Sequence, residues 1–426
     1  MAEWATISAD VCTEEQKLDN KKLYFEIKEN VLQKADHTRE LSNQELKDCI
    51  EGELQKRDKE GLLSFEKRRQ YAERLFASFR KFGVLQELIE DEEVTEILVN
   101  GPTHIFYEKA GELHCFEKSF SGEEELADLI QTICAGGNRM VNEASPIVDT
   151  RLPDGSRVNI VLPPISLDGA SVSIRKFSKE PMNMAALLSY GSLSEEIALF
   201  LEKLVIAGYN LFVSGGTGSG KTTFLNALSA YIPKDKRVIT IEDSAELQLN
   251  GIANLIRLET RTAGFEGVSP IGIRDLIKTA LRMRPDRLIV GECRGAEAID
   301  LLSANNTGHS GSLGTGHANS AYDMIHRLET MVLMGMDLPI AAIQRQIVSG
   351  IDVFIHLGRL RDKSRKVLEI AELDKVMGGN IRLNVLYRFM ETGEEEGKIQ
   401  GRWEKTGELL HQEKWDAAGF PSIEKR

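Results

Sequence analysis

The chain has 426 residues, which is too long for one ordinary hydrophobic core and, at about 150 residues per domain, predicts two or three domains. Apolar residues make up 42% and charged residues 28%, as in a soluble globular protein. The net charge of −13 argues against a general nucleic-acid binder, because contacts with phosphate groups require a surplus of lysine and arginine.

Cysteine spacing and the N-terminal segment indicate the compartment. The five cysteines are scattered with no CxxC pair, which fits neither a disulfide framework nor a structural zinc site and is typical of a reducing cytoplasm. The opening segment MAEWATISADVC lacks a basic region followed by an apolar one, and no stretch approaches the roughly 18 apolar residues of a membrane span. We therefore expect a cytoplasmic protein that associates with a membrane only through partners.

The first part of the chain predicts a helical extension followed by a small mixed domain. The extension consists mostly of helix formers with dense mixed charge, and Leu23, Ile27 and Val31 recur near helical spacing. Such amphipathic helices fit a solvated extension as well as a partner-docking element. Further on, alternating apolar residues and glycine turns predict hairpin strands, then a helix in EEELADLIQTICAGGNR and more short strands. We assign 1–88 to the extension and 89–182 to an α+β domain.

Strands and helices alternate in the rest of the chain. A linker at 183–190 precedes them, and Ser192 or Ser194 is suited to cap the helix that follows. Apolar strands such as LFVS and RLIV alternate with amphipathic helices, which predicts an α/β domain at 191–390 with a mostly parallel sheet and helices on both faces. Weak patterning beyond it predicts strands that trail into an exposed C-terminal tail at 391–426.

A phosphate-binding loop is the strongest motif in the sequence. The stretch GGTGSGKT fits the pattern GxxxxGK[ST] at every fixed position, after an apolar strand and at the start of a predicted helix. Its glycines let backbone N–H groups turn inward around a phosphate, while Lys221 supplies charge for the outer phosphates and Thr222 a hydroxyl for Mg²⁺. The predicted nucleotide-binding residues are Gly215, Gly216, Thr217, Gly218, Ser219, Gly220, Lys221, Thr222 and Thr223.

Three further segments carry polar residues that suit phosphate hydrolysis. VITIEDSAEL is an apolar run that stops at Glu242 and Asp243. RLIVGECRG contains an apolar run that stops at Glu292, and GHSGSLGTGHANS carries His309 and His317 among small residues. Because the carboxyl ends of parallel strands converge on one crevice, we expect these segments to face the phosphates, where hydrolysis needs metal support and a positioned water.

Each of these segments also has a purely structural interpretation. Glu242 and Asp243 would then cap the following turn, and either histidine alone would be a loop residue with satisfied hydrogen bonds. Two histidines among Gly, Ser and Thr, downstream of a phosphate loop, favour a functional role. Cys293, which follows a buried strand, is more typical of an inert filler than of a redox switch.

Taken in order, GGTGSGKTT, TIEDSAEL, LRMRPDRLIVGECRG and NTGHSGSLGTGHANS make the chain resemble the type II/IV secretion ATPase superfamily, and within it the CpaF branch of Tad/Flp pilus assembly ATPases. The resemblance covers about residues 94–374. It implies a RecA-like P-loop NTPase domain behind the α+β domain, Mg²⁺-dependent ATP hydrolysis and a homohexameric ring. The chain lacks the four-cysteine insert of the extension-motor branch and the retraction motor's C-terminal signature, which favours the CpaF branch.

The resemblance also implies roles for particular residues. Glu292 would be the Walker B carboxylate that orders the attacking water or the metal ion. Glu242, with Asp243 and Glu246 around it, would act on the metal and water side. His317 would sense the γ-phosphate.

The resemblance further implies arginines from the N-terminal domain. GSRV and SIRKF nominate Arg157 and Arg175 as residues that neutralise charge in the transition state. Arg261, Arg282 and Arg284 are weaker candidates, for which a salt bridge within the sheet domain is the better explanation.

The segment around His317 departs from the family pattern at one position. Gly316 stands where the family commonly has a bulkier apolar residue. Because glycine leaves the backbone more freedom, we expect a looser chain beside His317.

The predicted function is mechanical. A homohexamer at the inner face of the cytoplasmic membrane would convert ATP hydrolysis, through hinge motion at the domain junction, into a push on an integral platform protein. The output would be Tad/Flp-type pilus assembly or type II/IV protein secretion. A conjugation or translocation ATPase of a type IV secretion system would have a similar sequence, and a nucleotide-gated scaffold without productive turnover is the alternative of another class. Net acidity and the lack of an aromatic-studded basic groove count against a helicase, so we expect no nucleic-acid partner.

Overall fold

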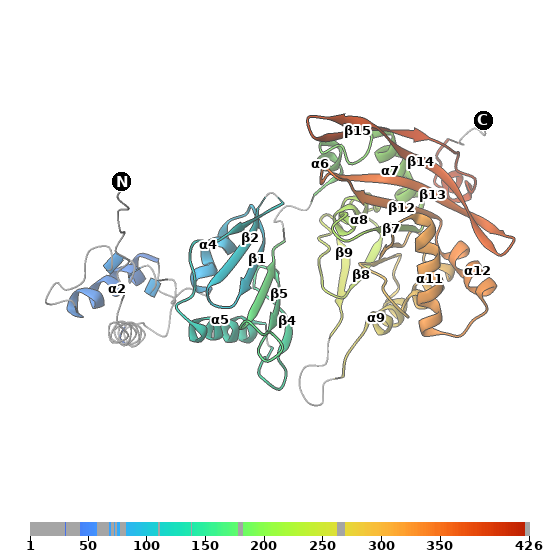
Figure 1. Ribbon diagram of the computed structural model, residues 1–426. Helices are drawn as coiled ribbons and strands as arrows, with labels where there is room; N and C mark the ends of the chain where they lie inside the picture. The colour runs from blue at the N-terminus through green and yellow to red at the C-terminus, as the bar shows by residue number, and fades with distance from the viewer. Residues whose placement is uncertain are drawn as a thin grey trace. The chain divides into compact units, whose positions relative to one another are not determined.

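The structure is a computed structural model that divides into two units, Met1–Lys179 and Glu180–Arg426 (Figure 1). The ranges it describes, apart from a few positions before residue 82, are 43–57, 82–109, 111–137, 139–177, 182–261 and 269–421. The helical residues predicted at Leu23, Ile27 and Val31 lie outside the described residues. In the same extension, α2 (Asn43–Arg57) is a described helix.

An antiparallel sheet packed on a helix forms the first unit. Its strands lie in the order β3-β2-β1-β6-β5-β4, and all neighbouring pairs are antiparallel. The strands are β1 (Val94–Asn100), β2 (His104–Lys109), β3 (Glu112–Cys115), β4 (Ile147–Arg151), β5 (Arg157–Val161) and β6 (Ser171–Arg175); the helices are η1 (Gly83–Leu85), α4 (Gln86–Glu90) and α5 (Glu123–Gly136). Ile130 and Ile133 of α5 share one core with Ile97 and Val172 of the central strands. The predicted α+β character of this region is confirmed.

A nine-stranded sheet, ordered β15-β14-β13-β12-β7-β11-β10-β8-β9, forms the second unit. Its strands are β7 (Leu211–Gly215), β8 (Arg237–Glu242), β9 (Asn254–Glu259), β10 (Arg287–Val290), β11 (Leu313–His317), β12 (Val353–Arg359), β13 (Arg365–Met377), β14 (Asn380–Glu395) and β15 (Lys398–Lys405). From β9 to β12 all neighbours are parallel, whereas β12 to β15 pair antiparallel. This mostly parallel sheet confirms the predicted α/β class.

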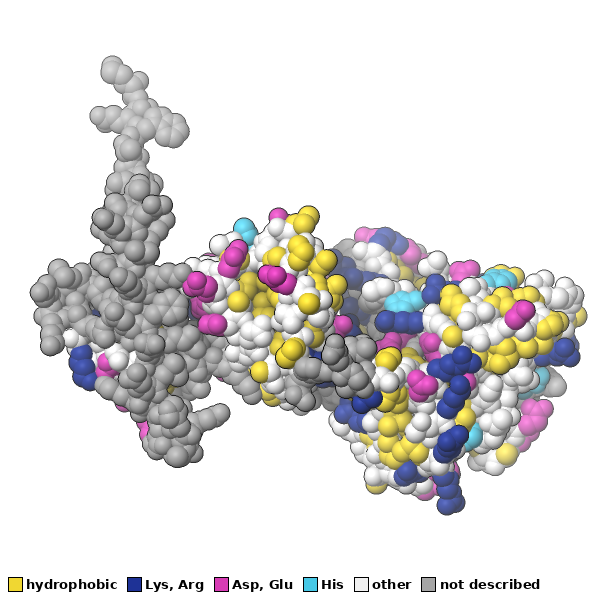
Figure 2. All heavy atoms as spheres, turned by 90° about the horizontal axis from the view of Figure 1, so that it is seen from below, with side chains coloured by type: hydrophobic (Ala, Val, Ile, Leu, Met, Phe, Trp, Pro, Cys, Tyr) yellow, Lys and Arg dark blue, Asp and Glu magenta, His cyan; other side chains and the backbone are white. Residues whose placement is uncertain are grey.

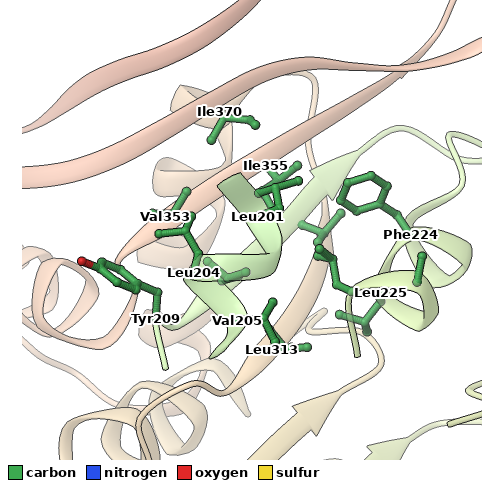
Figure 3. Close-up of a cluster of buried hydrophobic side chains, with 14 of the residues drawn as sticks. Leu201, Leu204, Val205, Tyr209, Phe224, Leu225, Leu313, Val353, Ile355 and Ile370 are labelled. Carbon is green, nitrogen blue, oxygen red and sulfur yellow. The ribbon is translucent and has the colours of Figure 1, made fainter. Parts of the chain in front are cut away.

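Helices cover both faces of this sheet, because successive residues of a strand point to opposite sides. Val213 of β7 lies in a core with α7 and α8, and its neighbour Phe212 lies in a core with α9 to α12. Figure 3 shows side chains of α7, α8, β11, β12 and β13 converging in the first core. Of the two serines expected to cap α7, Ser194 does so, accepting a hydrogen bond from the N–H of Ile197. The helices are α6 (Met184–Ser189), α7 (Glu195–Ala207), α8 (Lys221–Ser229), α9 (Ile273–Ala280), η2 (Leu281–Met283), α10 (Ala298–Asn306), α11 (Ala321–Gly335), α12 (Ile340–Gly350) and α13 (Glu413–Ala417).

Residues 391–421 belong to the sheet unit and do not form an exposed tail. The end of β14 and the whole of β15 extend the sheet, and α13 places Trp415 in the core, with its ring centroid 6.1 Å from that of Phe200 on α7. The tail prediction was wrong because antiparallel edge strands with an exposed face tolerate polar runs such as GEEEGK. Residues 183–190 likewise contain α6, which packs into the core, where a plain linker was expected.

Replacing Trp415 by alanine is expected to destabilise the second unit by about 3 kcal/mol, because the change removes buried apolar area and leaves a cavity. The residue is 4% exposed, and its Nε1–H donates to the carbonyl of Pro421 at 2.8 Å. Urea unfolding measures the free energy. The control Tyr190→Ala changes a residue that is 69% exposed and should cost less than about 0.5 kcal/mol. Equal losses in both variants would contradict a core role for the C-terminal segment.

The described surface carries charges of both signs. In the view of Figure 2, many Lys and Arg side chains lie on the second unit, with Asp and Glu side chains among them. Within the described ranges, no single helix is long and apolar enough to cross a membrane. The helices α11 and α12 together are long and apolar enough, but they are bent by 117° relative to each other.

Candidate active site

The phosphate loop joins β7 to α8 at the carboxyl end of the parallel strands. Gly218 and Gly220 have φ values of +70° and +91°, a left-handed conformation that residues with a side chain rarely adopt. Gly215 permits close approach of β12, because a Cβ atom there would lie 2.5 Å from the carbonyl oxygen of Leu357. These positions therefore explain why the loop needs glycine, and a glycine-rich loop of this kind can direct backbone N–H groups toward an anion.

Polar side chains of the loop are anchored on its own backbone. Ser219 is buried, and its hydroxyl donates to the carbonyl of Gly216 at 2.9 Å. Lys221 is also buried, and its Nζ donates to the carbonyl oxygens of Gly215 and Gly216 at 3.1 and 2.9 Å. Burial lowers the pKa of Lys221, and the nearby carboxylate of Glu292 acts in the opposite direction. The lysine charge is thus held at the loop.

His317 and Glu292 lie next to this lysine. His317 ends β11, which runs parallel to β7 with His317 opposite Gly215. Its Nδ1 lies 3.3 Å from Lys221 Nζ, and its Nε2 lies 2.9 Å from Oε1 of Glu292, which follows β10. The segments that carry these three side chains, far apart in the sequence, therefore meet at the carboxyl ends of adjacent parallel strands.

One tautomer of His317 suits the contact with Lys221. Burial lowers the pKa of His317, so the ring is neutral at pH 7 and carries a single N–H. With the proton on Nε2, Nδ1 is left to accept from the Lys221 ammonium. Nε2 lies 2.9 Å from Oε1 of Glu292, but within the described residues this oxygen has no hydrogen-bond partner. Burial raises the pKa of Glu292, but the hydrogen bond from Arg294 and the nearby positive charges outweigh it and lower that pKa. Glu292 is therefore ionised.

Arg294 is a member of this network that the sequence did not single out. Its Nη2 donates to Oε2 of Glu292 at 2.7 Å, and its Nη1 lies 4.0 Å from Oδ2 of Asp243. These contacts thus link the phosphate loop to the segments that carry Asp243, Glu292 and His317. A cation two residues after Glu292 is visible in RLIVGECRG, but only the turn that follows β10 directs it back to the carboxylate.

Glu242 is almost entirely buried at the end of β8, with 3% exposure. Its Oε2 accepts hydrogen bonds from the backbone N–H groups of Glu246 and Leu247 at 2.7 and 2.9 Å. Within the described residues, its Oε1 is buried without a hydrogen-bond partner. Burial raises the pKa of Glu242. The carboxylate packs against Gly291, because a Cβ atom there would lie 2.8 Å from Glu242 Cγ, and this explains the glycine before Glu292.

Replacing Gly291 by alanine is expected to cost about 1–3 kcal/mol of stability, because the added methyl group would collide with Glu242 in a packed interior. The displaced carboxylate should also lower the rate of nucleotide hydrolysis. Urea unfolding and steady-state phosphate release measure the two effects. Gly393→Ala is the matched control, because a Cβ atom at Gly393 meets nothing within 4 Å. A Gly291→Ala variant as stable and active as this control would show that the packing is not needed.

The residues predicted to hold Mg²⁺ are suitable if phosphate oxygens and water supply its other ligands. Within the described ranges, no group of three or more His, Cys, Asp or Glu side chains could hold a metal ion. Magnesium, however, commonly takes one or two protein ligands besides water and phosphate oxygens. Thr222, half-buried like Thr223 at the start of α8, has a hydroxyl of the required type, and the unpartnered Oε1 of Glu242 is a suitable anionic acceptor.

Comparisons with known proteins identify the family to which this chain belongs. The family model described as type II/IV secretion system protein matches residues 79–401. The chain belongs to this family. The type IV secretion system protein PtlH of Bordetella pertussis is 31% identical over 312 residues, which cover 67% of this chain and 92% of PtlH. A Mycobacterium tuberculosis protein with the provisional name conjugal transfer protein is 35% identical, over 70% of this chain and 85% of its own length.

A solved structure shares the fold. The ATPase DotB of Legionella pneumophila matches with a TM-score of 0.50 and 23% identity, over 68% of this chain and 80% of DotB. The second unit of this secretion-family protein is thus the predicted RecA-like domain.

Arg157 and Arg175 lie in the first unit of this secretion-family protein, whereas the phosphate loop lies in the second. They occupy opposite positions on β5 and β6, and Arg151 of β4 lies opposite Arg157. Three arginines therefore form one row across three strands. Arg151 was missed, although Arg151 and Arg157 flank the turn LPDGS and a hairpin pairs such residues. Their roles in catalysis stay predictions.

Several other candidates lie outside the contact network. His309 Nδ1 lies 3.1 Å from the carbonyl oxygen of Ala304 at the end of α10, and a functional role for this residue stays a prediction. Cys293 is fully buried, and burial raises the pKa of its thiol well above the usual value, as fits an inert filler. Arg261 donates to the carbonyl of Ser269 at 3.0 Å.

Gly316 is closely packed, contrary to the loose backbone predicted beside His317. It pairs with Ser214 of β7 within the sheet. A Cβ atom at Gly316 would lie 2.9 Å from Met324 Cε and 3.0 Å from Phe212 Cε1. Neighbouring side chains therefore fill the space that a bulkier residue would occupy, and they leave the backbone no additional freedom.

Proposed function

We propose that this protein is a motor ATPase that hydrolyses ATP with Mg²⁺ and works as a homohexamer on a pilus-assembly or secretion machine. The observation that carries the proposal is the chain of contacts from Lys221 through His317 to Glu292, because it joins a phosphate-binding cation to a water-positioning carboxylate. Family membership supports the same chemistry, since the protein is an ATPase of the type II/IV secretion family.

Each side chain of the contact chain has a physical role in hydrolysis. Lys221 places its charge on the outer phosphates, where negative charge is greatest. Ionised Glu292 accepts a hydrogen bond from a water and orients that water for in-line attack. Neutral His317 would contact Lys221 through Nδ1 and lie beside the Glu292 carboxylate at Nε2, so the ring would couple the position of the lysine to that of the carboxylate.

A bound Mg²⁺ ion and arginines of the first unit would add further positive charge at the phosphates. Thr222 and Glu242 would hold Mg²⁺, with Glu292 close by, and the bound ion would neutralise charge on the phosphate oxygens. Arg157 and Arg175 of the first unit would add positive charge when the two units close on the nucleotide.

The work done by the hydrolysis cycle is proposed from the family. Opening and closing of the two units in a homohexameric ring would push on an integral platform protein at the inner face of the cytoplasmic membrane. We favour the CpaF branch and Tad/Flp-type pilus assembly on the four ordered motifs. The second candidate is a conjugation or translocation ATPase, which the names of PtlH and of the mycobacterial relative favour. Neighbouring prepilin and platform genes would support the first candidate, and relaxase and coupling-protein genes the second.

Steady-state phosphate release tests the enzymatic part of the proposal. The wild-type protein is expected to release phosphate from ATP in the presence of Mg²⁺, and Lys221→Ala is expected to release none above background, because the outer phosphates lose their buried cation. A wild-type rate no greater than that of Lys221→Ala would instead identify a nucleotide-gated scaffold. The mass of the purified protein with and without nucleotide tests the homohexamer, and a monomer in both conditions would contradict it.

A further inference from the structure

The hairpin of β12 and β13 brings two arginines to the phosphate loop. β12 runs parallel to β7 with Leu357 opposite Gly215, so Arg359 lies two residues beyond the start of the loop at the same edge of the sheet. β13 returns antiparallel, and its first residue, Arg365, lies opposite Arg359. β7 has β11 on one side and β12 on the other. The arginines therefore flank the loop opposite His317.

Arg365 contacts the phosphate loop, and the guanidinium group of Arg359 lies beside it. Arg365 Nε donates to the carbonyl oxygen of Gly218 at 2.8 Å, and a Cβ atom at Gly220 would lie 3.3 Å from Arg365 Cδ. A Cβ atom at Gly218 would lie 3.9 Å from Arg359 Nη1. The glycines of the loop thus leave room for the two arginines as well as for the left-handed turn.

The charges of these two arginines are not balanced by neighbouring carboxylates. Within the described residues, neither Arg359 nor Arg365 forms an ion pair, and opposed like charges on paired strands repel each other. Arg361, in the turn of the same hairpin, is paired instead with Glu391 and Glu394. An anion between Arg359 and Arg365 would remove the repulsion.

We propose that Arg359 and Arg365 bind the phosphates of the nucleotide within the same subunit, as a second cationic arm facing Lys221. The inference rests on the proposed ATPase function. The bond from Arg365 Nε to Gly218 fixes the plane of the guanidinium group and leaves its Nη donors available. Such a preorganised fork suits the paired oxygens of a phosphate group.

A purely structural role would give a different pattern of effects. If Arg365 only braced the loop through Gly218, its removal would lower the melting temperature of the nucleotide-free protein. If the two arginines bind phosphate, their removal relieves repulsion in the nucleotide-free protein and leaves its melting temperature unchanged or slightly raised. The stabilisation that nucleotide adds would then fall, because ligand stabilises the folded state in proportion to its affinity.

The test uses the full chain with Arg359→Gln, Arg365→Gln, the double variant and the control Arg361→Gln, which removes a paired arginine from the same hairpin. Calorimetric titration with ADP and with a non-hydrolysable ATP analogue, each with Mg²⁺, measures Kd. We expect Kd to rise about tenfold for each single variant and more for the double variant, and to stay within about twofold for Arg361→Gln. Without nucleotide, the melting temperatures of the Arg359 and Arg365 variants should equal that of the wild-type protein or lie slightly above it.

Three results would overturn the inference. Affinities unchanged in the double variant would show that the arginines do not contact phosphate. An equal loss of nucleotide affinity in Arg361→Gln would show a general effect of charge. A lowered melting temperature with unchanged Kd would show that the arginines only stabilise the loop. In each case, wild-type binding that is lost in Lys221→Ala would leave the proposed ATPase function standing. No binding to the wild-type protein would refute both.

Discussion

Replacing Glu292 by glutamine is expected to reduce ATP hydrolysis about 10³-fold while nucleotide affinity changes little. Glutamine preserves the size of the side chain and can still contact His317 and Arg294. It lacks the negative charge that draws the proton of the attacking water, and that charge is stable here because Arg294 and its neighbours lower the pKa of Glu292. The interaction that is lost therefore matters mainly in the transition state.

The comparison of rate and affinity makes this expectation testable. Steady-state phosphate release gives the rate, and calorimetric titration with the ATP analogue gives the affinity. Glu391→Gln serves as the control, because this exposed carboxylate pairs with Arg361. A Glu292→Gln variant that turns over at the parental rate would remove the residue from the catalytic machinery.

Replacing Arg175 by glutamine is expected to lower kcat about 10³-fold and to weaken nucleotide binding by less than about tenfold. Negative charge on the transferred phosphoryl group grows toward the transition state, so an arginine that meets it there stabilises the transition state more than the bound substrate. Arg175 is exposed at the end of β6, where its guanidinium group is accessible to a ligand.

Separate measurement of kcat and Kd decides the role of Arg175. The control Lys118→Gln removes a cation of the first unit that is paired with Glu87, and it should leave both values unchanged. Equal damage to kcat and Kd in Arg175→Gln would reassign the residue to nucleotide binding. No damage to either would place the charge-stabilising function elsewhere, with Arg157 and Arg151 of the same row as the next residues to replace.

The order of elements could be predicted because it follows from local patterns. Apolar runs such as LFVS and LIV, bounded by glycine and polar residues, identify buried parallel strands. All residues of β7 and β10 are buried, including Arg287, whose burial the apolar pattern does not predict. The C-terminal strands escaped prediction because an edge strand lies half in water. The strand KIQGRWEK does alternate polar and apolar residues, but the polar run GEEEGK before it suggests an exposed tail, and the packing of Trp415 against Phe200 cannot be inferred from either.

The sequence by itself determined the chemistry of this protein: the phosphate loop, the carboxylates at strand ends, His317 and their order along the chain. Only the tertiary structure decided which of these groups meet. Parallel strand order places His317 beside Lys221, the turn after β10 directs Arg294 back to Glu292, and the β12–β13 hairpin brings Arg359 and Arg365 to the loop. The physical reason is that contact between distant residues depends on which strands become neighbours and in what register. That choice is made by packing of the whole sheet and is not encoded in any local stretch of the sequence.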